Sequence, residues 1–346
     1  MQLAELPAPL TRLVGRAAAL NELRRLLAQT RLLTLVGAGG VGKTRLALEL
    51  ARGSRAAYPD GVSQVQIAAL TDAALVPQAV AVAAMVREPP DRPLLEQLAH
   101  TLRDRQLLLV LDNCEHLLDA CAELVGTLLA SCPRLSILAT SRERLGLTGE
   151  TVWRVPSLAF PWPQAQLRVD KLADYAAVQL FMERVAEARP GFAIGSSPEA
   201  AAVASICYRL DGIPLALELA AARISVLGLQ EIADRLDDRF RLLTGGRRAA
   251  LPRHQTLRAS VSWSHDLLSP SELALFRRLS VFTGGWTLEA ANALTGEDVL
   301  DVLGQLVDKS LVQTSDHAGA TRYALLETIR AFASERLHER DRKSVV

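Results

Sequence analysis

Residues 32–47 read LLTLVGAGGVGKTRLA, and this stretch decides the fold of the chain. Its first five residues form a short, mostly apolar run, which is typical of a buried strand in a parallel sheet. A glycine-rich loop, GAGGVGKT at 37–44, comes next, and a helical pattern begins at Arg45. A strand, the pattern GxxxxGK[ST] and a helix, in this order, indicate a phosphate-binding loop.

The residue types of the loop explain its chemistry. The glycines let backbone N–H groups turn toward an anionic phosphate, and the start of the helix adds the positive end of its dipole. We expect Lys43 to contact the β- and γ-phosphates and the hydroxyl of Thr44 to bind Mg²⁺. The alternative is a glycine turn that only joins a strand to a helix.

Two further apolar runs end in polar residues. Leu107–Leu111 is followed by Asp112, a carboxylate at the edge where open α/β sheets place ligand chemistry. Beside a phosphate-binding loop, we expect Asp112 to hold the Mg²⁺ that Thr44 binds. The run 136–140 leads to Arg142, whose guanidinium can form directional bonds with a γ-phosphate, the alternative being an exposed arginine at a helix start.

The remaining patterns predict the architecture. Strands at 62–67 and 151–155, alternating with helices, complete a parallel, doubly wound α/β sheet between residues 32 and 155. After a proline-containing linker, helices dominate, and the last part predicts a winged helix. We expect the helices of the middle part at 172–188, 198–210, 214–226 and 229–240, and the winged helix as helices 270–280, 287–294 and 297–308, strands 311–314 and 321–325, and a helix 327–339.

The composition limits the classes of function. The formal net charge of +1 gives no global field that would attract nucleic acid or a membrane. The four cysteines form no CxxC pair, so we expect buried thiols in a reducing cytosol. The N-terminus lacks the pattern of a signal peptide, and no uncharged apolar run approaches 18 residues. We therefore expect a cytoplasmic protein.

Two segments bear on nucleic-acid binding. The segment 239–258 concentrates basic residues without interleaved aromatic residues, so we interpret it as an interdomain linker, with a nucleic-acid patch as the alternative. The predicted helix 297–308 carries Asp301 and three further acidic residues against Lys309. Because phosphate neutralisation dominates DNA affinity, we do not expect this helix to contact DNA directly.

Together these motifs resemble the nucleotide-binding core of STAND proteins (AP-ATPase, NB-ARC-like), of the type found in bacterial LuxR-like and SARP-like transcriptional regulators. The resemblance covers almost the entire chain. The segments on which it rests are LVGR at 13–16, GAGGVGKT at 37–44, LLLVLDNCEHL at 107–117, ATSRERLG at 139–146, LDGIPLALELAAAR at 210–223, RHQTLRASVSWSHDLL at 253–268 and YALLETIRAFASERL at 323–337.

The resemblance implies a domain plan and a set of site residues. It implies an N-terminal lead-in (1–12), a P-loop nucleotide-binding domain (13–160), a helical lid domain (161–250) and a winged-helix domain (251–346). The backbone of Val14 and Gly15 would contact adenine, Pro214 would pack on the base, and Arg142 would act as the sensor arginine. The full set for ATP or ADP is Val14, Gly15, Arg16, Gly37, Ala38, Gly39, Gly40, Val41, Gly42, Lys43, Thr44, Arg45 and Pro214, with Thr44 and Asp112 for Mg²⁺.

The chain departs from the family pattern at three places. Ala17 stands where the LVGR motif is usually followed by glutamate. Asn113 follows Asp112 where many relatives have a second acid, which leaves the water-activating base open, with Glu115 as a candidate. Leu326-Glu327 replaces a His-Asp pair that touches the ADP phosphate in eukaryotic relatives. We therefore list Lys43, Asp112, Glu115 and Arg142 as the candidates for catalysis, which we expect to be slow.

The function implied is an ATP/ADP-driven switch of a transcriptional or signalling regulator. ADP would hold the core shut, and exchange for ATP would open it to self-associate or to release an effector domain. Two alternatives stay open: a turnover ATPase that acts on an unidentified partner, and a DNA-binding repressor that uses the winged helix. Relatives continue into helical sensor repeats after the winged helix, so we expect the chain to be part of a longer regulator.

Overall fold

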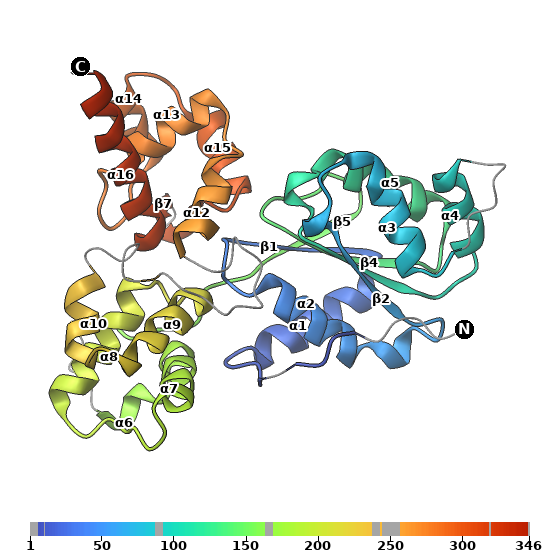
Figure 1. Cartoon of the computed structure of the whole chain (residues 1–346). Coiled ribbons are helices and arrows are strands. Elements are labelled where there is room, and N and C mark those ends of the chain that lie inside the picture. Colours follow the sequence, from blue (N-terminus) through green and yellow to red (C-terminus); the bar gives the residue numbers. More distant parts are fainter. Residues whose placement is uncertain are drawn as a thin grey trace. The chain divides into compact units, whose positions relative to one another are not determined.

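The computed structural model describes residues 6–9, 11–86, 93–162, 169–236, 243, 257–317 and 320–344 (Figure 1). The chain forms two compact units. The first comprises Met1–Gly37 and Gly42–Val155, and the second comprises Ala38–Val41 and Pro156–Val346. The middle of the glycine-rich loop therefore packs with the second unit, although its two ends belong to the first.

The first unit is built on a five-stranded sheet of order β2-β3-β4-β1-β5, in which every neighbouring pair is parallel. This confirms the predicted parallel, doubly wound α/β fold. Figure 1 shows α1 and α2 on one face of the sheet and α3 to α5 on the other. The strands are β1 (Leu32–Val36), β2 (Val62–Gln66), β3 (Leu108–Asp112), β4 (Ser136–Ser141) and β5 (Glu150–Arg154), and the helices are α1 (Ala17–Gln29), α2 (Lys43–Gly53), α3 (Val76–Ala83), α4 (Leu94–Leu102) and α5 (Leu118–Ser131).

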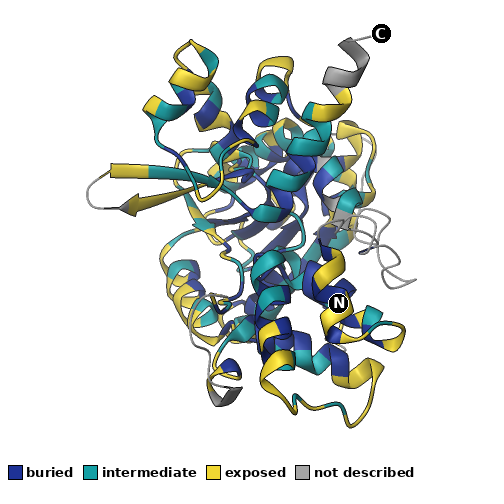
Figure 2. Ribbon diagram, turned by 90° about the vertical axis from the view of Figure 1, so that its left-hand side faces the viewer, coloured by how far each residue is buried: buried dark blue, intermediate teal, exposed yellow. Residues whose placement is uncertain are grey.

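The burial of the strands explains why their sequences are so apolar. Every residue of β1 and β3 is buried, because helices cover both faces of the sheet. Figure 2 shows these strands in dark blue. On the face of α3 to α5, Ile67, Leu98 and Leu124 belong to one continuous apolar cluster. Polar residues therefore follow the buried apolar runs, at the carboxyl ends of the strands.

The first part of the second unit is helical, as expected. Its helices are α6 (Val169–Leu172), α7 (Ala176–Ala188), α8 (Ser197–Arg209), α9 (Pro214–Ala221), the 3₁₀ helix η5 (Ala222–Ser225) and α10 (Leu229–Arg235). Pro214 is the first residue of α9, where a missing N–H costs nothing. The single helix predicted over 172–188 is wrong, because Tyr175 has an extended backbone that separates α6 from α7.

The second part is the predicted winged helix. Its elements are α12 (Leu257–His265), α13 (Pro270–Leu279), α14 (Leu288–Thr295), α15 (Leu300–Asp308), the antiparallel strands β6 (Val312–His317) and β7 (Ala320–Leu325), and α16 (Glu327–Ser344). The third predicted helix begins at Leu300 rather than at residue 297, because the side chain of Asp298 accepts a bond from the Leu300 N–H in a local turn. The basic segment 239–258 lies outside the described residues except for Leu243 and residues 257–258.

One ion pair ties two of these helices together. Glu272 caps the first turn of α13 by accepting from the Ser269 N–H, and it pairs with Lys309 beyond α15 at 2.8 Å. Burial raises the pKa of Glu272, but hydrogen bonds from Lys309 and Ser269 outweigh burial and leave the pKa below its usual value. Lys309 therefore forms its ion pair with a residue of the winged helix itself.

Two expectations from composition can be compared with the described residues. Cys114, Cys121, Cys132 and Cys207 are free and buried. Burial raises the pKa of the Cys207 thiol well above its usual value, as expected for a thiol that serves as a small apolar side chain. Within the described part of the chain, no helix is both long and apolar enough to cross a bilayer.

Candidate functional site

The glycine-rich loop connects β1 to α2 and is closed by its own lysine. The Lys43 ammonium donates to the Gly37 carbonyl at 2.7 Å. Gly42 has a φ of 97° and forms the N-cap of α2, so the helix opens directly at Lys43. This left-handed backbone favours glycine over any residue with a Cβ atom. The loop therefore presents a lysine and a helix start at the carboxyl edge of the sheet.

Thr44 and Asp112, 68 residues apart, meet at this edge. The Thr44 hydroxyl donates to Oδ1 of Asp112 at 2.6 Å. The Thr140 hydroxyl, at the end of β4, donates to the same oxygen at 2.6 Å. Burial raises the pKa of Asp112, and the two hydroxyl bonds offset only part of this shift. The site thus brings together the two residues that the sequence assigns to Mg²⁺, and adds Thr140, which sequence reasoning missed.

The donor set tests whether a nucleotide with Mg²⁺ fits here. Mg²⁺ prefers hard oxygen ligands, and it is bound through one or two protein groups plus substrate phosphates. A serine or threonine of the loop and an aspartate at a strand end are such a set, and they lie within hydrogen-bond distance of each other. Thr44 and Asp112 therefore fit a nucleotide with bound Mg²⁺.

Glu115 and Arg142, two further predicted site residues, form a buried ion pair. Arg142 Nε donates to Glu115 Oε1 at 3.1 Å, and the side chains are 5% and 2% exposed. The negative charge of Glu115 also helps to raise the pKa of Asp112. The second carboxylate oxygen of Glu115, Oε2, is buried and has no hydrogen-bond partner among the described residues.

The LVGR segment belongs to the first unit. Val14 and Arg16 are buried, and Gly15 has a φ of 67°. Arg45, predicted among the nucleotide-binding residues, donates to the Thr11 carbonyl at 2.6 Å and to the Thr11 hydroxyl at 2.7 Å. In this structure Arg45 therefore anchors the chain just before the LVGR segment to the helix that follows the loop.

The GxP turn at 212–214 belongs to the second unit, together with the middle of the loop. The Leu215 N–H donates to the Gly40 carbonyl at 3.2 Å. A Cβ atom on Gly40 would lie 2.9 Å from the Leu215 Cβ, so only glycine allows this approach. Pro214, the residue assigned to the base, directly precedes Leu215 and is half-buried.

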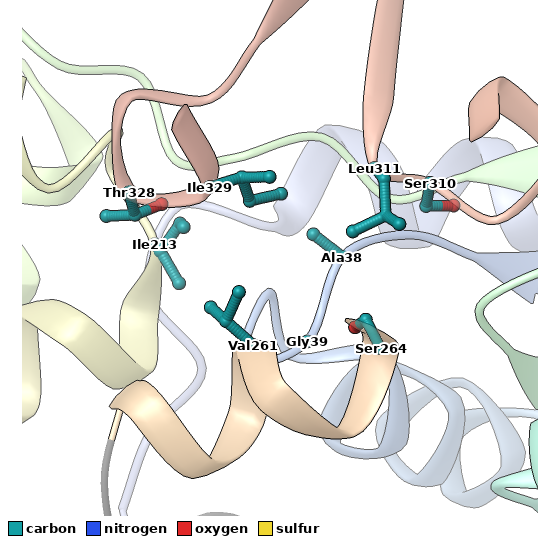
Figure 3. A pocket seen from close by; sticks show the side chains of 9 residues that line it. All are labelled: Ala38, Gly39, Ile213, Val261, Ser264, Ser310, Leu311, Thr328 and Ile329. Atoms are coloured by element: carbon teal, nitrogen blue, oxygen red, sulfur yellow. The ribbon is translucent and has the colours of Figure 1, made fainter. Parts of the chain in front are cut away.

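A small pocket lies next to this turn within the second unit (Figure 3). Its volume of about 10 Å³ holds roughly one water molecule, far less than a nucleotide needs. Figure 3 shows apolar side chains, among them Ala38, Val261 and Leu311, around the space. The lining residues are Ala38, Gly39, Ile213, Val261, Ser264, Ser310, Leu311, Thr328 and Ile329. Loop, GxP turn and winged helix therefore pack closely here.

Asp211 joins the GxP turn to the first turn of α16. Its Oδ1 accepts from the Glu327 N–H at 2.9 Å, and its Oδ2 accepts from the Thr328 N–H at 2.8 Å and the Thr328 hydroxyl at 2.9 Å. A carboxylate at a helix N-terminus satisfies otherwise unpaired N–H groups and interacts favourably with the helix dipole. Asp211 has a φ of 54°, a backbone conformation that aspartate tolerates better than most residues.

Comparisons with known proteins agree with this architecture. The family model described as an AAA domain matches residues 24–147, and the model of a winged helix-turn-helix domain matches residues 268–338. The chain is 43% identical over 337 residues to "Uncharacterized protein Rv0894" of Mycobacterium tuberculosis (strain ATCC 25618 / H37Rv), covering 95% of this chain and 82% of that protein. The chain belongs to the STAND family of P-loop ATPases.

A second relative is longer than this STAND chain. "Putative HTH-type transcriptional regulator Rv0890c" of the same organism is 51% identical over 321 residues, covering 91% of this chain and 35% of that protein. The chain therefore spans about a third of the length of this curated relative. The Walker-type ATPase PABY2304 of Pyrococcus abyssi shares 14% identity with a TM-score of 0.58, over 93% of this chain and 95% of that one, which shows the fold alone.

The residue pair Leu326-Glu327 leads into α16, and the Glu327 and Thr328 N–H groups at this helix start bond Asp211. The sequence offered one signal, an aspartate before the glycine of the GxP turn, which favours a left-handed backbone. Its partner lies more than 110 residues away, so no local pattern could have identified it.

Replacing Asp211 with alanine should destabilise the second unit by about 1–3 kcal/mol, because three hydrogen bonds to a carboxylate are lost and two helix N–H groups are left unpaired. Thr328→Val is the matched control, since it removes only the hydroxyl bond and leaves both N–H bonds intact. Urea unfolding followed by circular dichroism measures both variants. Equal midpoints for Asp211→Ala and the unmodified chain would contradict the capping role.

Proposed function

We propose that the chain is the ATP/ADP-binding switch core of a transcriptional or signalling regulator. The observation behind this proposal is the hydrogen bond between Thr44 and Asp112 beside Lys43, because it brings together the phosphate loop and the strand-end carboxylate that would hold Mg²⁺ and a nucleotide. The regulatory context is supported by the relative whose name describes an HTH-type transcriptional regulator. As part of the proposal, this regulator would act in the cytoplasm.

Each part of the nucleotide would have a defined partner. The backbone N–H groups of residues 37–42 and the Lys43 ammonium would bind the phosphates. Thr44 and Asp112 would hold Mg²⁺, which when bound neutralises phosphate charge and orients the phosphate oxygens. The backbone of Val14 and Gly15 would contact the adenine, Arg16 would also belong to the nucleotide site, and Pro214 would pack on the base.

The difference in binding free energy that a switch needs determines how many hydrogen bonds to the γ-phosphate are required. Moving an equilibrium from 1:99 to 99:1 requires about 5.5 kcal/mol of differential binding. A hydrogen bond to a charged group contributes about 1.5–3 kcal/mol. Two to four such bonds to the γ-phosphate, from Lys43 and Arg142, would therefore suffice. The same bonds would bias the chain toward self-association or release of an effector domain.

Hydrolysis should be slow, because the described residues next to Asp112 offer no carboxylate outside an ion pair that could activate water. Asn113 carries no charge, and Glu115 is paired with Arg142. Steady turnover above roughly 1 s⁻¹ would favour the turnover ATPase instead. Direct DNA contact is not part of the proposal: Asp301 and Asp308 on α15 are exposed, and Lys309 is paired with Glu272.

The nucleotide that the purified chain retains tests the proposal. We expect that denaturing the protein releases close to one equivalent of ADP, which chromatography separates from ATP. After exchange against excess ATP and Mg²⁺, size-exclusion chromatography should show a change in hydrodynamic radius or association state. A chain that holds no nucleotide and binds neither ADP nor ATP in a titration would overturn the proposal.

A further inference from the structure

The buried pair of Glu115 and Arg142 lies at the loop edge of the sheet. Val36, the last residue of β1, pairs in register with Ser141, and Asp112 pairs with Thr140. Arg142 follows Ser141 directly, so it stands at the level of Gly37, the first residue of the phosphate loop. Arg142 therefore follows β4, the strand that lies between β1, which leads into the loop, and β3, which ends in Asp112.

The backbone holds Glu115 rigidly in place. Asn113 has a φ of 72°, and its N–H bonds both the carbonyl and the hydroxyl of Thr140, at 3.1 and 2.9 Å. The 3₁₀ turn Cys114–His116 follows at once and is closed by the Leu117 N–H on the Cys114 carbonyl at 3.1 Å. The carboxylate is thus positioned by a short, hydrogen-bonded turn and not by a flexible surface loop.

Burial makes Arg142 essential to this carboxylate. A buried charge is costly unless a partner compensates it. Oε1 of Glu115 has Arg142, whereas Oε2 has no partner among the described residues. Any ligand that draws Arg142 away therefore leaves both oxygens of a buried carboxylate poorly compensated.

We propose that Glu115 competes with the γ-phosphate for Arg142 and thereby sets the preference of the site for ADP over ATP. A guanidinium forms the same directional, charge-assisted bonds with carboxylate and phosphate oxygens. ADP leaves the ion pair intact, whereas ATP must exchange it for a bond between Arg142 and the γ-phosphate. This inference rests on the proposed function, and it assigns Glu115 a specificity role instead of the role of a water-activating base.

Glu115→Gln separates the two roles, because glutamine keeps the size and one acceptor oxygen of the side chain but removes its charge. Isothermal titration of the nucleotide-stripped chain with ADP and with a β,γ-imido analogue of ATP, both with Mg²⁺, gives the two affinities. We expect the affinity for the ATP analogue to rise about 10-fold, since one charged partner is removed. The affinity for ADP should stay within about twofold.

Two further variants accompany this measurement. Glu123→Gln removes the same charge from an exposed position of α5 and should leave the ratio of the two affinities unchanged. Glu115→Asp keeps the charge but shortens the side chain, so the ion pair loosens and the rise for the ATP analogue should be smaller. If glutamine at position 115 prevents folding, as thermal unfolding would show, the aspartate variant provides the test.

The outcomes are distinguishable. If Glu115→Gln or Glu115→Asp binds the ATP analogue more tightly relative to ADP, and Glu123→Gln does not, the inference is supported. An unchanged ratio of affinities, with turnover alone reduced, would assign Glu115 to catalysis and overturn the inference while the proposed function stands. If the unmodified chain binds neither nucleotide, the proposed function fails and the inference fails with it.

Discussion

Replacing Lys43 with alanine should lower the affinity for both ADP and ATP by about 100-fold or more. Lys43 is the one positively charged residue of the loop GAGGVGKT, and its ammonium donates to the Gly37 carbonyl at 2.7 Å. Loss of two charge-assisted bonds, at about 1.5–3 kcal/mol each, corresponds to a factor of roughly 10²–10⁴ in the dissociation constant. Isothermal titration with each nucleotide in the presence of Mg²⁺ measures the effect.

The control for Lys43→Ala is the same substitution at Lys171. Lys171 is 67% exposed on α6, and its ammonium lies 3.7 Å from Asp174, an exposed pair that contributes little to stability. Lys171→Ala should therefore bind both nucleotides as the unmodified chain does. Thermal unfolding without nucleotide reports whether each variant is folded. A folded Lys43→Ala chain with unchanged affinities would remove the loop from the proposed site.

Gly212→Ala should destabilise the second unit by about 2–5 kcal/mol, the sum of an unfavourable left-handed backbone and a steric clash. Gly212 has a φ of 61°, and a Cβ atom there would lie 2.2 Å from the Leu158 carbonyl oxygen and 2.8 Å from Phe160. The clash cannot relax easily, because the Leu158 N–H also bonds the Gly212 carbonyl at 3.0 Å. Urea unfolding gives the change in free energy.

Gly191→Ala isolates the contribution of the clash. Gly191 has a φ of 81°, but a Cβ atom there would meet nothing within 4 Å. We expect this variant to lose only about 1–2 kcal/mol, the cost of the left-handed backbone itself. Similar losses for Gly191→Ala and Gly212→Ala would show that the close approach of the GxP turn to residue 158 does not matter for stability.

Local patterns predicted most of the elements but not all of their limits. Short apolar runs identified β1, β3 and β4, since a parallel sheet covered on both faces needs such runs. Helix α5 was not predicted, and neither was the separation of α6 from α7 at Tyr175. Such boundaries depend on tertiary hydrogen bonds, for example the bond from the Ala177 N–H to the Ala159 carbonyl.

The sequence by itself determined the phosphate loop and the pairing of Thr44 with Asp112, because parallel strands end at a common edge and the motif states which residue types stand there. Only the tertiary structure decided that Thr140 shares the Asp112 oxygen and that Glu115 holds Arg142. It also decided that Asp211 caps α16, 116 residues further along the chain. These partners are far apart in sequence, and nothing in either local pattern specifies the other, so packing alone selects them.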